Sequence, residues 1–537
     1  MEDEEIILPP DPARVMEGLR DTGYDFNTAM ADIIDNSIAA EASKISVQVE
    51  KNPDNQINVY VADNGCGMNM EELKNAMKYG SKERTDPSSL GKFGLGLKTA
   101  STAFCRQLSV LSKGSDGEYH KVQWDLDEIA KINKWKLLTP EIESDEIDRL
   151  EQTSEGKTGT LIIWKKVDRL LKTYQIDANR ERALKKLIEK LIQHCSMVYE
   201  RFLDKSKYPE VRKIDLYIND QKIEPWDPFC REEEKTRSLG SQSPEVDLPD
   251  GKKSKFYVEA FLLPRVEEFS TPEAKSKARI SNDMEGFYIY RENRLIYHGD
   301  WLGMFVNDPH ISLLRVNFSF DHTLDDAFNV DIKKSQIMLS EEIYSYLKDN
   351  FIPAPRREAE NIYRKGNNAQ IIKSSAGAHD SSNNNISSKA SQVIGSSVKV
   401  IDATSGKVQI TNSQGSFAGT IKILEPKRNN ELNVIPVESI DYDMLWEPTI
   451  VKGNHAVSIN QSHPYYNRVY APNINNSTLI IGMDSLLWSL SEAELSTYNE
   501  ATKQQYEDMR IQVSRILKKL INDLPETDAS DMSNEEN

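Results

Sequence analysis

The chain has 537 residues and a formal net charge of -18, from 67 Lys and Arg against 85 Asp and Glu. A chain of this length is too long for one hydrophobic core and predicts about three or four domains. The acidic balance disfavours general binding to nucleic acid or to anionic membranes, so any DNA contact must come from a local basic patch.

The spacing of the cysteines and the hydropathy of the chain indicate the cellular compartment of the protein. The four cysteines, Cys66, Cys105, Cys195 and Cys230, are far apart and lack zinc-ligand spacing, so we expect reduced thiols in a reducing compartment. We expect Cys66 and Cys105 to be small core residues. The acidic opening MEDEEIILPP lacks the pattern of a signal peptide, and no run of about 18 apolar residues occurs. We expect a soluble intracellular protein, cytoplasmic, or nucleoid-associated or nuclear if it is linked to DNA.

A helix and two strands are predicted near the start of the chain. Residues 24–42 carry apolar side chains at helical spacing, and Asp32 and Asn36 lie one turn apart on another face of that helix. Residues 44–50 and 56–63 alternate apolar and polar side chains, which predicts a hairpin of half-buried strands.

The second strand ends in the sequence DNGCGM, residues 63–68. Gly65 and Gly67 permit a tight turn with positive φ, and residues 69–81 then predict a second helix. Taken alone, these glycines are equally explained by closing a hairpin, and Asp32 with Asn36 by a solvated helix face.

The stretch LGKFGLGLKTAS, residues 90–101, places three glycines at the predicted start of a helix. It is not a P-loop, because Leu97 occupies the lysine position of that motif and Lys98 follows one residue late. The glycines also reverse the order of a dinucleotide fingerprint. Backbone amides beside glycines and a helix N-terminus still favour an anion, so the stretch predicts a phosphate site.

Four segments occur in a set order: DIIDN at 32–36, DNGCGM at 63–68, GKFGLGLK at 91–98 and TGT at 158–160, which opens a predicted strand. Together they resemble the nucleotide-binding motifs of the GHKL superfamily, which groups DNA gyrase, ninety-kilodalton heat-shock chaperones, histidine kinases and MutL proteins. AMADIIDNSIAA and GFYIYRENRLI are similar in particular to segments of the Microrchidia (MORC) ATPases and their prokaryotic counterparts. The resemblance covers roughly residues 1–345.

This resemblance implies an α+β fold, in which a Bergerat-type ATPase sandwich of helices on a mixed sheet precedes an S5-like α/β transducer domain. It also implies ATP and Mg2+ as cofactors. Asp63 would accept the adenine amino proton, Thr160 would steady Asp63 directly or through water, and Asn36 would ligate the metal. The base pocket and the phosphate lid would supply the other cofactor-binding residues: Gly65, Gly67, Met68, Gly91, Lys92, Phe93, Gly94, Leu95, Gly96 and Lys98.

The catalytic residues depart from the family pattern at one position. The family's general base is usually a glutamate four residues before the asparagine, whereas this chain has the shorter Asp32. We expect slow hydrolysis, because general-base assistance contributes about two to four powers of ten in rate. Asp35 is the alternative carboxylate. In the second domain the resemblance implies a lysine that reaches the γ phosphate: Lys334 fits best, and Lys333 is the alternative.

Five parts are predicted along the chain. Residues 1–175 form the ATP-binding domain, 176–365 the transducer domain, 366–420 a flexible Ser/Asn-rich linker, 421–524 a small C-terminal α+β domain, and 525–537 a disordered acidic tail. The segment KIDLYINDQKIEPWDPF predicts a strand, a turn and a strand that open the transducer domain.

The C-terminal domain is predicted to contain a long helix, opened by a capping box of Ser491 and Glu494. One face of this helix is apolar, and it either pairs with a second copy or packs on its own domain. The residues of that face are Met509, Val513, Ile516, Leu517 and Leu520. We expect a homodimer.

Two classes of function compete. In a DNA-associated clamp, as the MORC and MutL resemblance implies, ATP brings two N-terminal domains together and hydrolysis releases them. Lysines in KKVDRLLK, NRERALKK and GKKSK would then face a closed channel. Genome maintenance and defence against foreign DNA are both open. A heat-shock-type protein-remodelling chaperone would instead use exposed apolar surface in the middle and C-terminal parts. A histidine kinase is disfavoured, because no phosphoacceptor helix precedes the ATP-binding segment.

Overall fold

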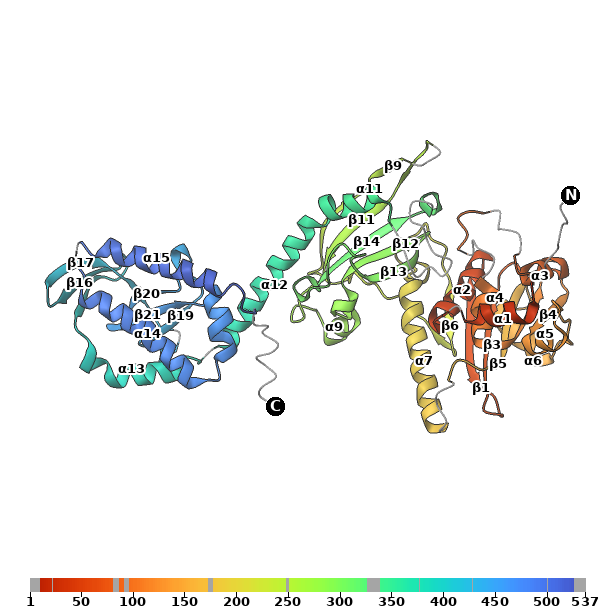
Figure 1. Ribbon diagram of the computed structural model, residues 1–537, viewed down its shortest axis with the longest axis horizontal. Helices are drawn as coiled ribbons and strands as arrows, with labels where there is room; N and C mark the ends of the chain where they lie inside the picture. The colour runs from red at the N-terminus through yellow and green to blue at the C-terminus, as the bar shows by residue number, and fades with distance from the viewer. Residues whose placement is uncertain are drawn as a thin grey trace, which may run out of the picture. The chain divides into compact units, whose positions relative to one another are not determined.

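The computed structural model describes residues 10–21, 23–80, 86–90, 96–171, 177–247, 251–325, 339–375, 377–426, 428–499 and 501–525. The chain separates into two compact units, residues 1–360 and 361–537 (Figure 1). Each unit has its own hydrophobic core.

The first unit opens with a sheet and its covering helices. In chain order the elements are α1 (Pro12–Arg20), α2 (Phe26–Ala39), β1 (Lys44–Lys51), β2 (Ile57–Asp63), α3 (Met70–Met77), α4 (Gly96–Phe104), β3 (Cys105–Lys113), β4 (Tyr119–Asp125), α5 (Leu126–Ile132), α6 (Ser144–Ser154), β5 (Gly159–Val167), α7 (Asp177–Val198), α8 (Glu200–Leu203), β6 (Asp215–Ile218) and β7 (Gln221–Lys222). The sheet order is β4-β3-β5-β2-β1-β6-β7. Because β1 pairs antiparallel with β2 and parallel with β6, the sheet is mixed, as predicted.

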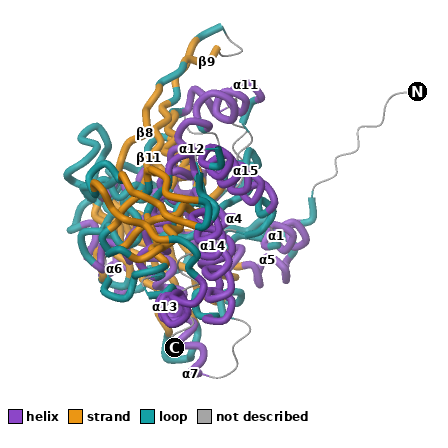
Figure 2. The backbone as a smooth tube through the Cα atoms, turned by 90° about the vertical axis from the view of Figure 1, so that its left-hand side faces the viewer, coloured by secondary structure: helices purple, strands orange, loops and turns teal. Residues whose placement is uncertain are grey.

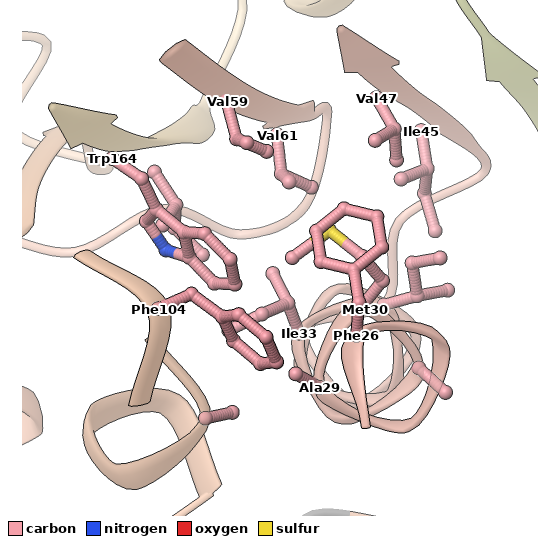
Figure 3. Close-up of a cluster of buried hydrophobic side chains, with 14 of the residues drawn as sticks. Phe26, Ala29, Met30, Ile33, Ile45, Val47, Val59, Val61, Phe104 and Trp164 are labelled. Atoms are coloured by element: carbon pink, nitrogen blue, oxygen red, sulfur yellow. The ribbon is translucent and has the colours of Figure 1, made fainter. Parts of the chain in front are cut away.

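Helix α2 packs on one face of this sheet. Its N-cap Asp25 accepts hydrogen bonds from the backbone of Asn27 and Thr28, which fixes where the helix begins. Its inward side chains then meet the alternate residues of β1 and β2 (Figure 3). Phe104, at the end of α4, stacks on Trp164 of β5 with ring centroids 6.1 Å apart, and meets Phe26 of α2 edge to face at 5.7 Å, which holds α4 beside α2.

The opposite face of the sheet is covered by α6. Leu150 of this helix joins a buried cluster with Tyr60, Leu161 and Ile163 from the strands beneath it. A buried ion pair between Lys121 and Glu146, with 2.6 Å between Nζ and Oε2, fastens α6 to β4. The sheet therefore has helices on both faces, and helices on a mixed sheet are what the sequence predicted.

The hairpin β6–β7 is a strand, a turn and a strand, as the sequence predicted, but it belongs to the first sheet and not to the second domain. Leu216 and Ile218 are buried in the first core, and the Asn219 side chain pairs with both backbone groups of Val49 at 2.8 and 3.0 Å. The parallel edge of β1 therefore recruits β6 after the chain has passed through α7 and α8.

A second sheet follows within the same unit. Its elements are β8 (Arg237–Gln242), β9 (Glu245–Asp247), β10 (Lys253–Lys255), β11 (Tyr257–Leu262), α9 (Pro272–Ala278), η1 (Asn282–Met284), β12 (Gly286–Arg291), β13 (Arg294–Asp300), η2 (Pro309–Ile311), β14 (Leu314–Phe320), η3 (His322–Leu324), α11 (Glu341–Ser345) and η4 (Tyr346–Phe351). The order is β13-β12-β14-β11-β8, and β9 and β10 form a separate two-stranded arm. Figure 2 shows this arm extending beyond β8 and β11.

The boundary between the two units falls within α12 (Pro353–Ser374), which begins in the first unit and ends in the second. The further elements of the second unit are α13 (Asp380–Val393), β15 (Ser397–Asp402), β16 (Lys407–Asn412), β17 (Gly415–Thr420), β18 (Lys422–Leu424), β19 (Val434–Val437), η5 (Asp441–Asp443), β20 (Trp446–Val451), β21 (Asn454–Asn460), η6 (Tyr466–Tyr470), η7 (Ala471–Asn473), α14 (Ser477–Ser496) and α15 (Lys503–Leu520). Its sheets have the orders β15-β16-β17 and β18-β20-β21-β19.

The structure has regular elements where we expected a flexible linker at residues 366–420. The reason is visible at Asn383 of α13, which is buried: its side chain bonds the backbone of Asn433 and Val434, so a polar sequence is ordered by specific hydrogen bonds. Ser491 and Glu494 do not open a new helix, because they lie inside α14. The tail from residue 526 lies outside the described residues.

The apolar face of α15 was expected either to pair with a second copy or to pack on its own domain. Met509, Val513 and Leu517 pack against the core of the second unit, so most of the predicted stripe is used within its own domain. Ile516 and Leu520 stay exposed at 48% and 73%. Across the described part of the chain, no helix is both long and apolar enough to span a membrane.

Candidate functional site

Asp63 is the last residue of β2, and its carboxylate is buried. Oδ2 accepts a hydrogen bond from Ser37 Oγ of α2 at 2.7 Å, and Oδ1 accepts one from the backbone N–H of Gly65 at 2.9 Å. Burial raises the pKa of Asp63, and the bonds from Ser37 and from the backbone of Gly65 and Thr160 oppose that rise. The side chain is therefore a fixed hydrogen-bond acceptor at the end of a strand.

The two glycines after Asp63 are needed for different reasons. Gly67 has φ +64, and a Cβ there would lie 1.9 Å from the carbonyl oxygen of Lys113. A Cβ on Gly65 would lie 2.6 Å from the carbonyl oxygen of Ala40, although Gly65 does not have a positive φ. The predicted positive-φ turn is thus correct for Gly67, while Gly65 is required by the close approach of α2.

Ser112 holds the far side of this turn and was not predicted from the sequence. Its Oγ accepts from the backbone N–H of Met68 at 2.9 Å and lies 2.9 Å from Thr160 Oγ1. Thr160 sits opposite Asp63 in the pairing of β2 with β5, so its predicted place beside Asp63 agrees with the structure. Cys66, which we expected in the core, is exposed, because it lies at the outside of the turn; Cys105 is buried as expected.

Helix α2 brings Asp32 and Asn36 to one place. Asn36 Nδ2 donates to the backbone carbonyl of Asp32 at 2.8 Å, and Tyr24 donates its hydroxyl hydrogen to Asp32 Oδ2 at 3.1 Å. Gly96, the first residue of α4, lies against the same carboxylate: a Cβ on it would be 3.8 Å from Asp32 Oδ2. The positive end of α4 therefore faces the helix that carries Asp32.

Asp35, the alternative catalytic carboxylate, is engaged by other groups. Arg294 of β13 lies 3.2 Å from Asp35, and Tyr199 donates its hydroxyl hydrogen to Asp35 Oδ1 at 2.9 Å. All three side chains are buried. Asp35 therefore joins α2 to the second sheet and to the end of α7.

Lys98 lies within α4 and is buried. Its Nζ donates to the carbonyl oxygens of Ala76 and Lys78, each at 2.9 Å, where the C-terminal end of α3 attracts a cation. Burial lowers the pKa of Lys98 to about 8. The structure gives Lys98 the role of joining α4 to α3, and its contact with a phosphate stays a prediction.

Several predicted residues lie outside the described part of the chain. They are the lid residues Gly91, Lys92, Phe93, Gly94 and Leu95, and the lysines Lys333 and Lys334. Among the described residues, the structure brings together Asp32, Asn36 and Gly96 where α2 meets the start of α4, and Asp63, Gly65, Gly67, Met68 and Thr160 around the turn after β2.

Comparison with known proteins matches this same region. Residues 24–160 match the family described as histidine kinase-, DNA gyrase B-, and HSP90-like ATPase. This segment is a GHKL ATPase domain. The domain contains α2, the turn after β2, α4 and the first residues of β5, which are the parts that build the site.

Two curated relatives are similar to part of this chain. ATPase MORC2B of Mus musculus is 25% identical over 139 residues, and ATPase MORC2 of Homo sapiens is 22% identical over 139 residues. Each match covers 24% of this chain and 14% of the relative. The chain thus matches only a small part of these relatives' length, and the similarity is to MORC ATPases.

The site of the ATPase domain carries groups suited to the base and the phosphates of a nucleotide. Asp63 presents a buried acceptor for a base, and α4 presents a helix N-terminus suited to phosphate. No group of three or more His, Cys, Asp or Glu side chains suited to a metal occurs in the described ranges. A Mg2+ ion at Asn36 would therefore take its other ligands from phosphate and water, as this ion commonly does.

Proposed function

We propose that the chain binds ATP between the turn after β2 and the N-terminal end of α4, and that it hydrolyses the nucleotide slowly with Mg2+. The observation that carries this proposal is the fixed carboxylate of Asp63, held by Ser37 at 2.7 Å and by Gly65 at 2.9 Å. A carboxylate that two donors hold in place can accept a hydrogen bond from the adenine amino group without reorganising.

The assigned roles follow the site from base to phosphate. Asp63 reads the base, Gly65, Gly67 and Met68 shape its pocket, and Asn36 ligates the metal. Asp32 acts as the general base, and Lys334 or Lys333 contacts the γ phosphate. Hydrolysis is slow because Asp32 is one methylene shorter than glutamate, which shortens its reach to an attacking water.

Calorimetry with Mg-ATP tests the proposal directly. Wild-type protein is expected to release or absorb heat with a saturating isotherm, and Asp63→Ala to weaken binding by at least about tenfold through loss of a charged hydrogen-bond acceptor. Asp116→Ala is the matched control, because this carboxylate is exposed and pairs with His120. Absence of binding by a folded wild-type protein would exclude the proposal.

We further propose that ATP brings two copies together and that the dimer contacts DNA. The support is a basic face on α7, where Arg182, Lys185, Lys186 and Lys190 are exposed and lie within about half the helix circumference. In the other two basic segments, KKVDRLLK and GKKSK, lysines form ion pairs with nearby carboxylates. Lys253 and Lys255 of the arm both pair with Glu245 at 3.3 Å, and Lys166 pairs with Asp125 and Asp127.

Gel shifts across a range of salt, with and without a non-hydrolysable ATP analogue, test the DNA contact. The double variant Lys185→Gln and Lys186→Gln is expected to lower the salt slope of binding by about two, because two phosphate contacts are lost. The double variant Lys253→Gln and Lys255→Gln is the control and should change binding little. Light scattering with and without the analogue reports the proposed dimer.

A protein-remodelling chaperone is the second candidate, and α14 is the observation that favours it. Leu479, Leu486 and Leu490 lie on one face of this helix and are 39%, 62% and 37% exposed. Exposed apolar surface of this kind binds unfolded segments or a partner. The test is whether the protein suppresses aggregation of a thermally unfolding client. The chaperone is favoured over the clamp if this suppression is lost in Leu486→Ser and occurs in a protein that does not bind DNA.

A further inference from the structure

The turn between β12 and β13 carries two arginines that both leave the second sheet for the ATPase domain. Arg291 ends β12 and Arg294 begins β13, and the two are paired across the hairpin. The residues between them, Glu292 and Asn293, have φ of 49° and 67°, which is the backbone of a tight two-residue turn. The spacing of the backbone of the two arginines is therefore fixed by the turn.

Arg294 reaches the helix that carries the candidate general base. Its Nε lies 3.2 Å from Asp35, and its Nη1 donates to the carbonyl of Leu295 at 3.1 Å. The side chains of Arg294 and Asp35 are only 5% and 1% exposed. Asp35 stands between Asp32 and Asn36 in α2, so a shift of this pair would move both of those side chains.

Arg291 reaches a second part of the ATPase domain. Its Nη2 donates to the carbonyl of Pro87 at 3.1 Å, just before the buried residues Ser89 and Leu90. The same guanidinium holds Asp325 with two bonds of 2.6 and 2.8 Å. In the sequence, Leu90 directly precedes the glycine stretch, and Asp325 precedes the segment that contains Lys333 and Lys334.

We infer that the turn from Arg291 to Arg294 is a positioning element for the ATP site, through which the second sheet sets the placement of α2 and of residues 87–90. This inference rests on the proposed function. Arg294 acts through Asp35 on Asp32 and Asn36, and Arg291 acts through the backbone of Pro87. Both arginines are positioning residues: Arg294 contacts Asp35, and Arg291 contacts the backbone of Pro87.

The kinetic split between turnover and affinity tests the role of Arg294. Arg294→Lys keeps the charge and loses the planar fork, so the Asp32 and Asn36 side chains shift, while Asp63 stays in place at the end of β2. We expect kcat to fall roughly tenfold to a hundredfold, with the Kd for ATP changed by no more than about threefold. A role in folding alone would leave kcat per folded molecule unchanged.

A double-mutant cycle identifies the partner. If Arg294 acts through Asp35, then Arg294→Gln, Asp35→Asn and the double variant should have similar kcat values, because either change removes the same contact. Additive losses would show that the two residues act separately and would overturn this route. The double variant also keeps the test usable if a single variant is poorly folded, because it leaves no unpaired buried charge.

Arg315→Lys is the matched control for a buried arginine of the second sheet. The Arg315 guanidinium donates to the carbonyls of Pro228, Ala278 and Arg279 and not to the ATPase domain. It should lower stability without changing kcat per folded molecule.

Arg291→Lys tests the second contact. It should lower the ratio of ATP to ADP affinity by roughly threefold or more, because residues 87–90 lead into the proposed phosphate-binding stretch. An unchanged ratio overturns the role of Arg291, and a kcat unchanged in Arg294→Lys overturns that of Arg294. Both results presuppose a wild type that binds and hydrolyses ATP. A wild type that does not bind ATP overturns the proposed function instead.

Discussion

Ser37 of α2 donates a hydrogen bond to Asp63 at the end of β2 across 2.7 Å, and this bond joins the helix of the candidate general base to the candidate base-reading carboxylate. Ser37 follows Asn36 directly in the chain. One helix therefore carries a residue for each end of the proposed nucleotide.

Ser37→Ala should weaken ATP binding by about tenfold, because a hydrogen bond to a charged group contributes roughly 1.5–3 kcal/mol. Loss of this donor also raises the pKa of Asp63 further. As pH is lowered, the ATP affinity of the variant should therefore begin to fall at a higher pH than that of wild type. Calorimetry across pH measures both effects. Ser109→Ala is the control, since that buried hydroxyl bonds Gln123 within the sheet; equal losses in the two variants would contradict the prediction.

Asp63→Asn should stabilise the free protein at neutral pH while it weakens ATP binding. Burial raises the pKa of Asp63 in the folded state, so the folded protein binds this proton more tightly than the unfolded chain. The stability that protonated Asp63 contributes is therefore lost as pH rises from the ordinary carboxyl pKa of 3.8 through the pKa of the folded state. Denaturant titrations should show a higher free energy of unfolding for Asp63→Asn than for wild type at neutral pH, and no difference below pH 3.8. A variant that is less stable at neutral pH would contradict this sign.

Gly67→Ala should destabilise the ATPase domain by clearly more than the roughly 1 kcal/mol of an unsuitable backbone conformation, because its Cβ would also meet the carbonyl of Lys113. Gly117→Ala is the matched control. Gly117 has φ +78, and a Cβ there would meet nothing within 4 Å. Chemical denaturation of both variants separates the contact from the cost of positive φ. Equal losses would show that the close approach to Lys113 is not what requires glycine.

Asp32→Asn should lower kcat by about a hundredfold with little change in ATP affinity, because it removes a general base and leaves the base pocket intact. Asp32→Glu should raise kcat, since the longer side chain restores the reach of the family's glutamate. Steady-state ATPase assays on both variants, with Asp35→Asn beside them, check the assignment. Loss of turnover in Asp35→Asn with full activity in Asp32→Asn would assign the base to Asp35.

The predicted local elements were recovered where a short pattern fixes the structure. The alternation of Ile45, Val47 and Val49 specifies one face of β1, and the helical spacing of Met30, Ile33 and Ile34 specifies α2. The motif residues Asp63 and Gly67 could be placed for the same reason. The GHKL resemblance then supplied the order of the ATPase domain.

Contacts between distant segments could not be predicted from such patterns. Ser112 lies 44 residues from Met68 and Arg294 lies 259 residues from Asp35, and nothing in the spacing of either pair marks it. The placement of β6 depends on a free edge of β1, which periodicity does not reveal. The linker prediction was wrong around Asn383. Composition shows that this residue is polar, but it does not show the backbone groups to which its side chain is hydrogen-bonded.

The exposed position of Cys66 makes the turn after β2 chemically addressable. Cys105 and Cys195 are buried, and burial raises the pKa of the half-buried Cys230 to about 11, so near neutral pH a thiol-reactive dye should attach first at Cys66. The backbone N–H of Cys66 donates to the carbonyl of Ala40 at 2.9 Å, so the backbone that carries the dye is held in place. The natural sequence thus carries a reporter beside the proposed adenine pocket, and nucleotide occupancy can be followed by fluorescence without engineering a new cysteine.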